Sequence, residues 1–131
     1  MATFPVPDWI GDTGEANVEA HLCGRGARTL RSIGSFGPAD VEATWRWTNG
    51  FSWFQHTWLV QVKTSITSDP AVPSDVELSA LRRLASHRML LHGGVVRPIY
   101  ARVWLRWQFD QWLCWIDYYD IWTGQLILQF P

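Results

Sequence analysis

The chain has 131 residues, a formal net charge of −1, 47% hydrophobic residues and 18% charged residues. This composition describes one globular domain with enough apolar side chains for a core, and it argues against a multidomain enzyme. No uninterrupted apolar run reaches the roughly 18 residues of a membrane span, and the first residues lack the basic and apolar regions of a signal peptide. We therefore expect a single soluble, intracellular domain over residues 1–131, of either cellular or viral origin.

Cysteine and tryptophan usage narrows the class of protein. Cys23 and Cys114 lie far apart without a CxxC spacing, which excludes a zinc ribbon and a disulfide-linked miniprotein. We expect both thiols to be reduced and buried. The ten tryptophans are a strong bias, because each ring offers about 200 Å² of contact area and an N–H that needs a partner when buried. We expect these rings to lie in the core and in a dimer interface, and the alternative is a set of stacking platforms for unpaired bases, for which Arg46 between Trp45 and Trp47 is the best candidate.

Basic residues are concentrated in the middle of the chain. All eleven Lys and Arg residues fall between residues 21 and 106, together with five acids, and both flanks are acidic. Ten of the eleven are arginines, so the single lysine, Lys63, calls for an explanation. A basic segment on a nearly neutral chain favours a nucleic-acid face of limited extent, with solvated arginines as the alternative.

The first predicted element is a helix of about three turns. Asp12 and Glu15 have the spacing of a capping box, Val18 and Leu22 give an apolar stripe, and two glycines follow at the expected end. A short strand over residues 27–33 and a loop rich in glycine and proline come next.

A β-hairpin follows that loop. Its first strand starts near Asp40, and the segment Thr48-Asn49-Gly50 is typical of a type I′ turn. The chain returns over residues 56–65 as a further strand, and residues 68–75 are interpreted as a loop.

The second helix has the clearest signals in the chain. Ser74 and Glu77 have capping-box spacing, and Gly93-Gly94 supplies a stop. Its apolar face carries Leu78, Leu81, Leu84 and Ala85. Two or three strands rich in aromatic residues follow, over residues 99–107, 112–120 and 125–130. The order predicts an α/β fold in which helices flank a mixed central β-sheet.

Three polar residues of the hairpin are candidates for chemistry. In a strand, residues two apart point to the same face, so Gln61 and Lys63 should project together beside Asp40. Phosphodiester hydrolysis needs oxygen ligands for a divalent ion and a cation near the attacking water or the phosphate. A lysine suits the second role because its pKa responds to its neighbours.

These motifs resemble those of a known nuclease superfamily. Pro38-Ala39-Asp40 with Gln61-Val62-Lys63 is similar to the PD-(D/E)XK core, and residues 11–63 resemble the archaeal-type Holliday junction resolvases. Those proteins have a glutamate on the first helix, an arginine strand, a serine loop, an aspartate and an E-x-K strand. The present sequence has Glu15, Arg31, Ser35, Asp40 and Lys63 in that order.

The resemblance implies a fold, a reaction and roles for residues. The fold would be a restriction-endonuclease-like core, and the activity would be metal-dependent cleavage of four-way DNA junctions by a homodimer. Glu15, Asp40 and Gln61 would bind Mg²⁺, or Mn²⁺ in its place. Lys63 would position or activate water, and Ser35 would lie at the scissile phosphate. The residues expected to contact DNA are Arg25, Arg28, Arg31, Ser35, Arg82 and Arg83.

The sequence departs from the family at one metal-binding position. The acid of the E-x-K motif is Gln61, whose neutral carbonyl oxygen can bind a hard cation but brings no negative charge. Glu42, two residues after Asp40, is a candidate for the missing carboxylate. The basic residues that related resolvases carry before the first helix are also lacking.

Other interpretations stay open. One alternative for Glu15 is a role in a capping box alone, and the polar and apolar alternation of Gln61-Val62-Lys63 is also that of any half-exposed strand. Two alternatives for the chain are another PD-(D/E)XK nuclease acting on linear or mismatched duplex and a catalytically silent DNA-binding relative. A tryptophan-rich β-domain that binds glycans or proteins is a further alternative. The four histidines lack the spacing of a zinc site.

Overall fold

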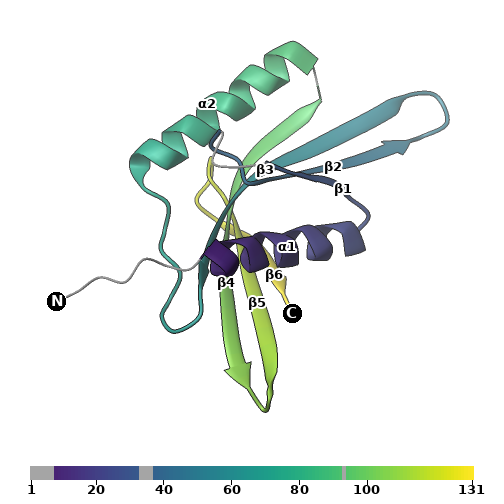
Figure 1. Cartoon of the computed structure of the whole chain (residues 1–131). Helices are drawn as coiled ribbons and strands as arrows, with labels where there is room; N and C mark the ends of the chain where they lie inside the picture. Colours follow the sequence, from purple (N-terminus) through teal and green to yellow (C-terminus); the bar gives the residue numbers. More distant parts are fainter. Residues whose placement is uncertain (1–7, 33–36, 93) are drawn as a thin grey trace.

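The computed structural model describes residues 8–32, 37–92 and 94–131 (Figure 1). Within them the elements are α1 (Asp8–Gly24), β1 (Arg28–Arg31), β2 (Val41–Thr48), β3 (Trp53–Ser65), α2 (Asp75–His92), β4 (Val95–Gln108), β5 (Gln111–Asp120) and β6 (Leu126–Phe130). The predicted order of helices and strands is confirmed, and the aromatic-rich C-terminal part forms three strands.

The strands form one mixed sheet in the order β1-β2-β3-β4-β5-β6. Each neighbouring pair is antiparallel except β3 and β4, which are parallel and are joined through α2. A parallel pair needs such a crossover, because a tight turn cannot join two strands that run in the same direction. The chain is therefore an α/β protein with a six-stranded mixed sheet and two helices packed against it.

The two helices cover opposite faces of the sheet, because side chains alternate between the faces along a strand. On β3, Val60 belongs to the core beneath α1 with Val18 and Leu22, whereas Leu59 belongs to the core beneath α2 with Leu81. All five side chains are fully buried, which confirms the predicted apolar stripes of both helices. Neither of the helices in the described ranges is long and apolar enough to cross a membrane.

The capping box predicted for the first helix is wrong, and the one predicted for the second is confirmed. α1 begins at Asp8, so Asp12 lies within the helix. Burial of Ile10 favours this additional N-terminal turn. At α2, the Glu77 N–H donates to the Ser74 hydroxyl at 3.2 Å, and the Ser74 N–H donates to Glu77 Oε1 at 3.1 Å. Two backbone donors are thereby satisfied at the start of α2.

The hairpin is confirmed, but the two-residue type I′ turn is wrong. β2 and β3 are joined by four residues, 49–52. The N–H groups of Phe51 and Ser52 both donate to Asn49 Oδ1 at 2.9 Å, so the asparagine side chain closes the loop. Gly50 adopts a φ of 93°, which a residue with a Cβ rarely does. Strand β3 accordingly begins at Trp53, three residues earlier than predicted.

Both cysteines are free, as expected, but the expectation that both are buried is wrong. Cys23 is exposed at the end of α1, because the helical period turns it away from the core stripe that contains Leu22. Cys114 is half-buried, and burial raises the pKa of its thiol to about 11.

Gly14 marks a close approach of α1 to the sheet, where an added Cβ would overlap the Thr64 side chain. We predict that Gly14→Ala lowers the free energy of unfolding by about 1–3 kcal/mol, measured by urea denaturation. The control is Gly11→Ala on the same helix, where a Cβ meets nothing within 4 Å. It should stabilise the protein by up to about 1 kcal/mol. Equal effects of the two substitutions would contradict the close packing at Gly14.

Candidate active site

Asp40 lies immediately before β2, and its carboxylate contacts β3. Its backbone N–H donates to the Val60 carbonyl oxygen at 2.8 Å, which joins the residue to the sheet. Its Oδ2 accepts a hydrogen bond from the Val62 N–H at 2.8 Å. The carboxylate therefore lies beside the part of β3 that carries Gln61 and Lys63, as the sequence predicts.

Gln61 and Lys63 point to the face of β3 that α2 covers, and a glutamate of α2 joins them. Gln61 Nε2 and Lys63 Nζ donate to the same atom, Oε2 of Glu77, at 2.5 Å and 2.8 Å. Gln61 is buried, and Lys63 and Glu77 are half-buried. The three side chains form one polar cluster between β3 and α2.

Glu77 is the site residue that sequence reasoning missed. Its spacing from Ser74 predicts a capping box, and one carboxylate oxygen does serve that role. The other oxygen binds the two polar side chains of β3. The one available signal was topological: a crossover helix starts near the carboxyl end of the strand it leaves, and residues 61–65 form that end of β3.

Glu15 approaches the same end of β3 from the opposite face of the sheet. The contact of Gly14 with Thr64 brings this turn of α1 onto the strand. Arg31 Nη2, from β1, lies 3.0 Å from Glu15 Oε2 and 3.6 Å from a carboxylate oxygen of Asp12. Arg31, predicted to contact phosphate, and Glu15, predicted to bind metal, are thus paired with each other.

Burial disfavours the ionised forms of two of these carboxyl groups. It raises the pKa of Asp40 above its usual value, and the negative charge of Glu77 adds to this, while a backbone N–H and Lys63 oppose it. Burial also raises the pKa of Glu15, with a smaller contribution of the same sign from Asp40 and an opposing one from Arg31. For both groups, burial therefore outweighs the opposing contacts with N–H groups and cations.

The pKa of Glu77 shifts in the opposite direction. The hydrogen bond from Lys63 is the largest cause, and the backbone N–H of Ser74 adds to it, so the pKa of Glu77 falls to about 2. This carboxylate stays ionised throughout the neutral range, and it holds the ammonium group of Lys63 in place.

The oxygen donors at this end of β3 suit a hard divalent cation. Gln61 Oε1 is buried and has no hydrogen-bond partner in the described part of the chain. Its orientation is assigned by the bond of Nε2 to Glu77. Among residues 8–32, 37–92 and 94–131, no three Asp, Glu, His or Cys side chains converge on a common metal position. Glu15 and Glu77 are instead held by cationic side chains, and either would have to turn to join Asp40 and Gln61 on an ion.

The other carboxylate considered from the sequence is engaged elsewhere. Glu42 accepts two hydrogen bonds from Arg88 of α2, at 2.5 Å and 3.2 Å. It therefore links β2 to α2. Ser35, the predicted phosphate contact, lies outside the described residues.

The arginines predicted to contact DNA do not share one surface. Arg25 follows α1 and Arg28 lies on β1, and both are exposed. Arg82 and Arg83 are exposed on α2, which covers the opposite face of the sheet. Of the five predicted arginines, Arg31 is the one that the structure brings to the candidate site.

Comparison with known proteins assigns no family. No family model matches the chain, and no significant match was found among curated proteins or among solved structures. The interpretation of the site therefore rests on its geometry and on the resemblance of its motifs.

Asp40→Asn should cost no stability in the absence of metal, because it removes a charge that burial disfavours and keeps an oxygen for the Val62 N–H. At pH 7 in EDTA we predict a free energy of unfolding equal to that of the unsubstituted protein or higher by up to about 1 kcal/mol.

The direction of the pKa shift of Asp40 also predicts how the stability difference between the two proteins changes with pH. Since the pKa of Asp40 is raised in the folded state, acidification through that pKa removes the penalty. The advantage of the asparagine should vanish below about pH 4. Urea denaturation at both pH values measures this, and a loss of more than about 1 kcal/mol at pH 7 would contradict the assignment.

Proposed function

We propose that the protein is a metal-dependent endonuclease of the PD-(D/E)XK type that hydrolyses phosphodiesters in branched DNA, with the four-way junction as its preferred substrate. The observation that carries this proposal is the hydrogen bond from the Val62 N–H to the Asp40 carboxylate. It places the carboxylate beside the segment of β3 that contains Gln61 and Lys63. Hydrolysis needs oxygen ligands and a nearby cation, and these residues supply both at one end of β3.

The order of the elements supports a restriction-endonuclease-like core. Such a core would begin with a helix bearing a glutamate, continue with three antiparallel strands, and return through a crossover helix to a parallel strand. The elements α1, β1 to β3, α2 and β4 follow that order. Strands β5 and β6 extend the sheet on the far side of β4 (Figure 1).

Each residue of the site has a proposed role. Asp40 and Gln61 Oε1 would hold Mg²⁺ or Mn²⁺, and Glu15 would join them after its carboxylate turns away from Arg31. When bound, the ion would act as a Lewis acid on the scissile phosphate and would lower the pKa of a bound water. Lys63 orients the attacking water or binds a phosphate oxygen. Glu77 fixes the Lys63 ammonium through the 2.8 Å ion pair.

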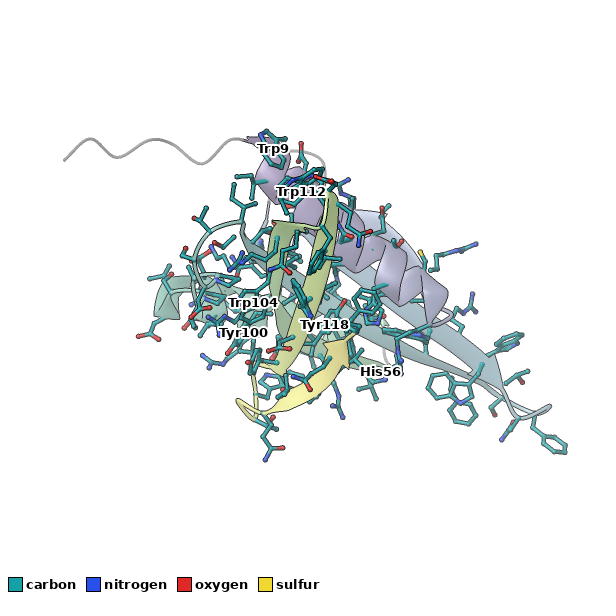
Figure 2. The ribbon with its side chains drawn as sticks, turned by 90° about the horizontal axis from the view of Figure 1, so that it is seen from below. Trp9, His56, Tyr100, Trp104, Trp112 and Tyr118 are labelled. Atoms are coloured by element: carbon teal, nitrogen blue, oxygen red, sulfur yellow. The ribbon has the colours of Figure 1, made fainter. Side chains whose placement is uncertain are left out.

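A homodimer is part of this proposal, because two sites related by twofold symmetry can cut the two opposing strands of a junction. A cluster of half-exposed tryptophans supports it. The ring of Trp112 lies 5.9 Å from that of Trp9 and 5.5 Å from that of Trp107, between centroids (Figure 2). Exposed aromatic rings of this kind are typical of protein interfaces.

A catalytically silent DNA-binding relative is the second candidate. The observation that favours it is the pairing of Glu15 with Arg31 and of Glu77 with Lys63, which neutralises two of the carboxylates in the described conformation. Calorimetric titration with Mn²⁺ separates the two functions. Binding that Asp40→Asn abolishes supports the nuclease, and absence of binding supports the silent relative.

The central prediction concerns cleavage of a labelled four-way junction and of a linear duplex of the same sequence, in Mg²⁺. We expect paired nicks in the junction alone, and Lys63→Ala should reduce their rate at least about 100-fold, because it removes the cation beside the reacting phosphate. Its affinity for the junction in EDTA should change less than about threefold, since the rest of the DNA surface is intact.

The outcomes separate the alternatives. Cleavage of both substrates would indicate another nuclease of the same superfamily. Junction binding without cleavage in either metal would overturn the proposed activity.

Glu77→Gln tests the role of the glutamate that α2 contributes. Gln retains the capping box with Ser74 but removes the charge that fixes Lys63. We predict a 10- to 100-fold lower cleavage rate, an order of magnitude typical for loss of a charged positioning group. Asp75→Asn, which removes an exposed acid from the same helical turn, is the control and should stay within about twofold of the unsubstituted rate. Equal rates for the two variants would remove Glu77 from the site.

A further inference from the structure

The hairpin between β2 and β3 carries a second surface that the candidate active site does not use. It extends away from both helices (Figure 1). We define the hairpin surface as Arg46, Trp47, Phe51, Trp53 and Phe54. Its aromatic side chains are 49%, 97%, 68% and 42% exposed, in chain order. Aromatic rings exposed to this extent on a protruding ribbon indicate a binding surface.

Both faces of this ribbon carry aromatic rings. Trp47 and Phe54 are register partners, and their rings stack with centroids 5.7 Å apart and planes inclined by 19°. On the other face, the guanidinium of Arg46 lies 5.4 Å from the centre of the Trp53 ring. A flat seam with a second copy of the chain would bury one face and leave the other in water. Two aromatic faces and an aromatic tip instead suit a ligand that wraps around the ribbon or stacks on it.

The charge of the hairpin favours a polyanion. Residues 43–58 contain one arginine and no acid. A surface of aromatic rings with a cation and no negative charge is the combination that binds single-stranded nucleic acid, because bases stack on the rings while the backbone meets the cation. Such binding tolerates any base sequence, since every base has a π-face.

The face of the hairpin that carries Trp47 and Phe54 leads inward to a cavity of about 270 Å³. The residues that line this cavity are Arg25, Trp45, His56, Trp58, Ile127 and Leu128. The rings of Trp45 and Trp58 lie 5.1 Å apart between centroids. His56 Nε2 and Trp58 Nε1 are buried and lack hydrogen-bond partners among the described residues. Hydrogen-bonding capacity at the wall of the cavity is therefore unused, and the His56 ring (Figure 2) lies at the inner end of the hairpin.

We propose that the hairpin surface and this cavity bind the unpaired bases of a DNA strand by stacking. This inference rests on the proposed function for the identity of the nucleic acid, and it deepens it by naming what the substrate must contain. From Trp53 to Lys63, β3 spans about 33 Å at roughly 3.3 Å per residue. That distance corresponds to about ten nucleotides of a stacked strand, so one DNA molecule reaches both the hairpin surface and the candidate active site.

The test measures binding in EDTA, where cleavage does not contribute. The probes are a single strand of 12 nucleotides carrying one 2-aminopurine and a blunt duplex of the same sequence. We expect the single strand to bind more tightly than the duplex, and its fluorescence to fall as the base stacks on an indole ring. The double substitution Phe51→Ala and Trp53→Ala should weaken single-strand binding roughly 5- to 150-fold and leave duplex binding within about twofold.

The control is Trp122→Ala, which removes another exposed indole ring, 43% exposed, from the turn between β5 and β6. It should leave both affinities unchanged. Equal affinity of the unsubstituted protein for the two probes, or equal losses on both probes in the double variant, would overturn the inference. A dimer that dissociates in the double variant while single-strand binding persists would assign the hairpin surface to a second copy and would overturn it as well.

These results are distinguishable from failure of the proposed function. Selective single-strand binding without junction cleavage would leave the hairpin inference standing and remove the nuclease. Normal cleavage by the double variant with unchanged single-strand binding would remove the hairpin inference alone.

Discussion

Every part of the candidate site depends on β3 lying at the centre of the sheet with one helix on each face. Because side chains alternate along a strand, Gln61 and Lys63 face α2, whereas Val60 and Thr64 face α1. The parallel pairing with β4 enforces this division, since the crossover must carry α2 over one face and leaves the other to α1. Two helices distant in sequence thereby approach the same end of one strand.

Burial of carboxyl groups at that end of β3 makes an unfavourable contribution to folding. Burial raises the pKa values of Asp40 and Glu15, and the arginine and lysine of the site compensate only for some of the charge. Raised pKa values of carboxyl groups occur both in structural ion-pair networks and at sites that receive a cation, and the proposed metal site accounts for both of these groups. The buried Gln61 Oε1 without a hydrogen-bond partner in the described ranges is consistent with the same interpretation.

Local signals in the sequence predicted much of the fold and part of the site. The α2 capping box and the alternation that puts Gln61 beside Lys63 depend on neighbours in the chain, and both are confirmed. The start of α1 was missed because burial of Ile10, a tertiary effect, outweighed the capping signal. The role of Glu77 was missed for a similar reason: a carboxylate that caps a helix with one oxygen gives no local sign of what the other binds. Which arginines share a surface was equally beyond local reasoning.

The length of β3 connects the hairpin surface with the candidate active site. Its inner end holds the polar cluster, and its outer end, paired with β2 through eight register positions, carries the aromatic hairpin. Because β3 is continuous between them, the distance between the two surfaces follows from the residue count and the rise per residue of a strand. A substrate that engages both must offer a phosphodiester at one end and unpaired bases at the other. Regular duplex does not meet that requirement, and DNA near a branch point does. The geometry of strand β3 therefore links the proposed chemistry to the proposed choice of substrate.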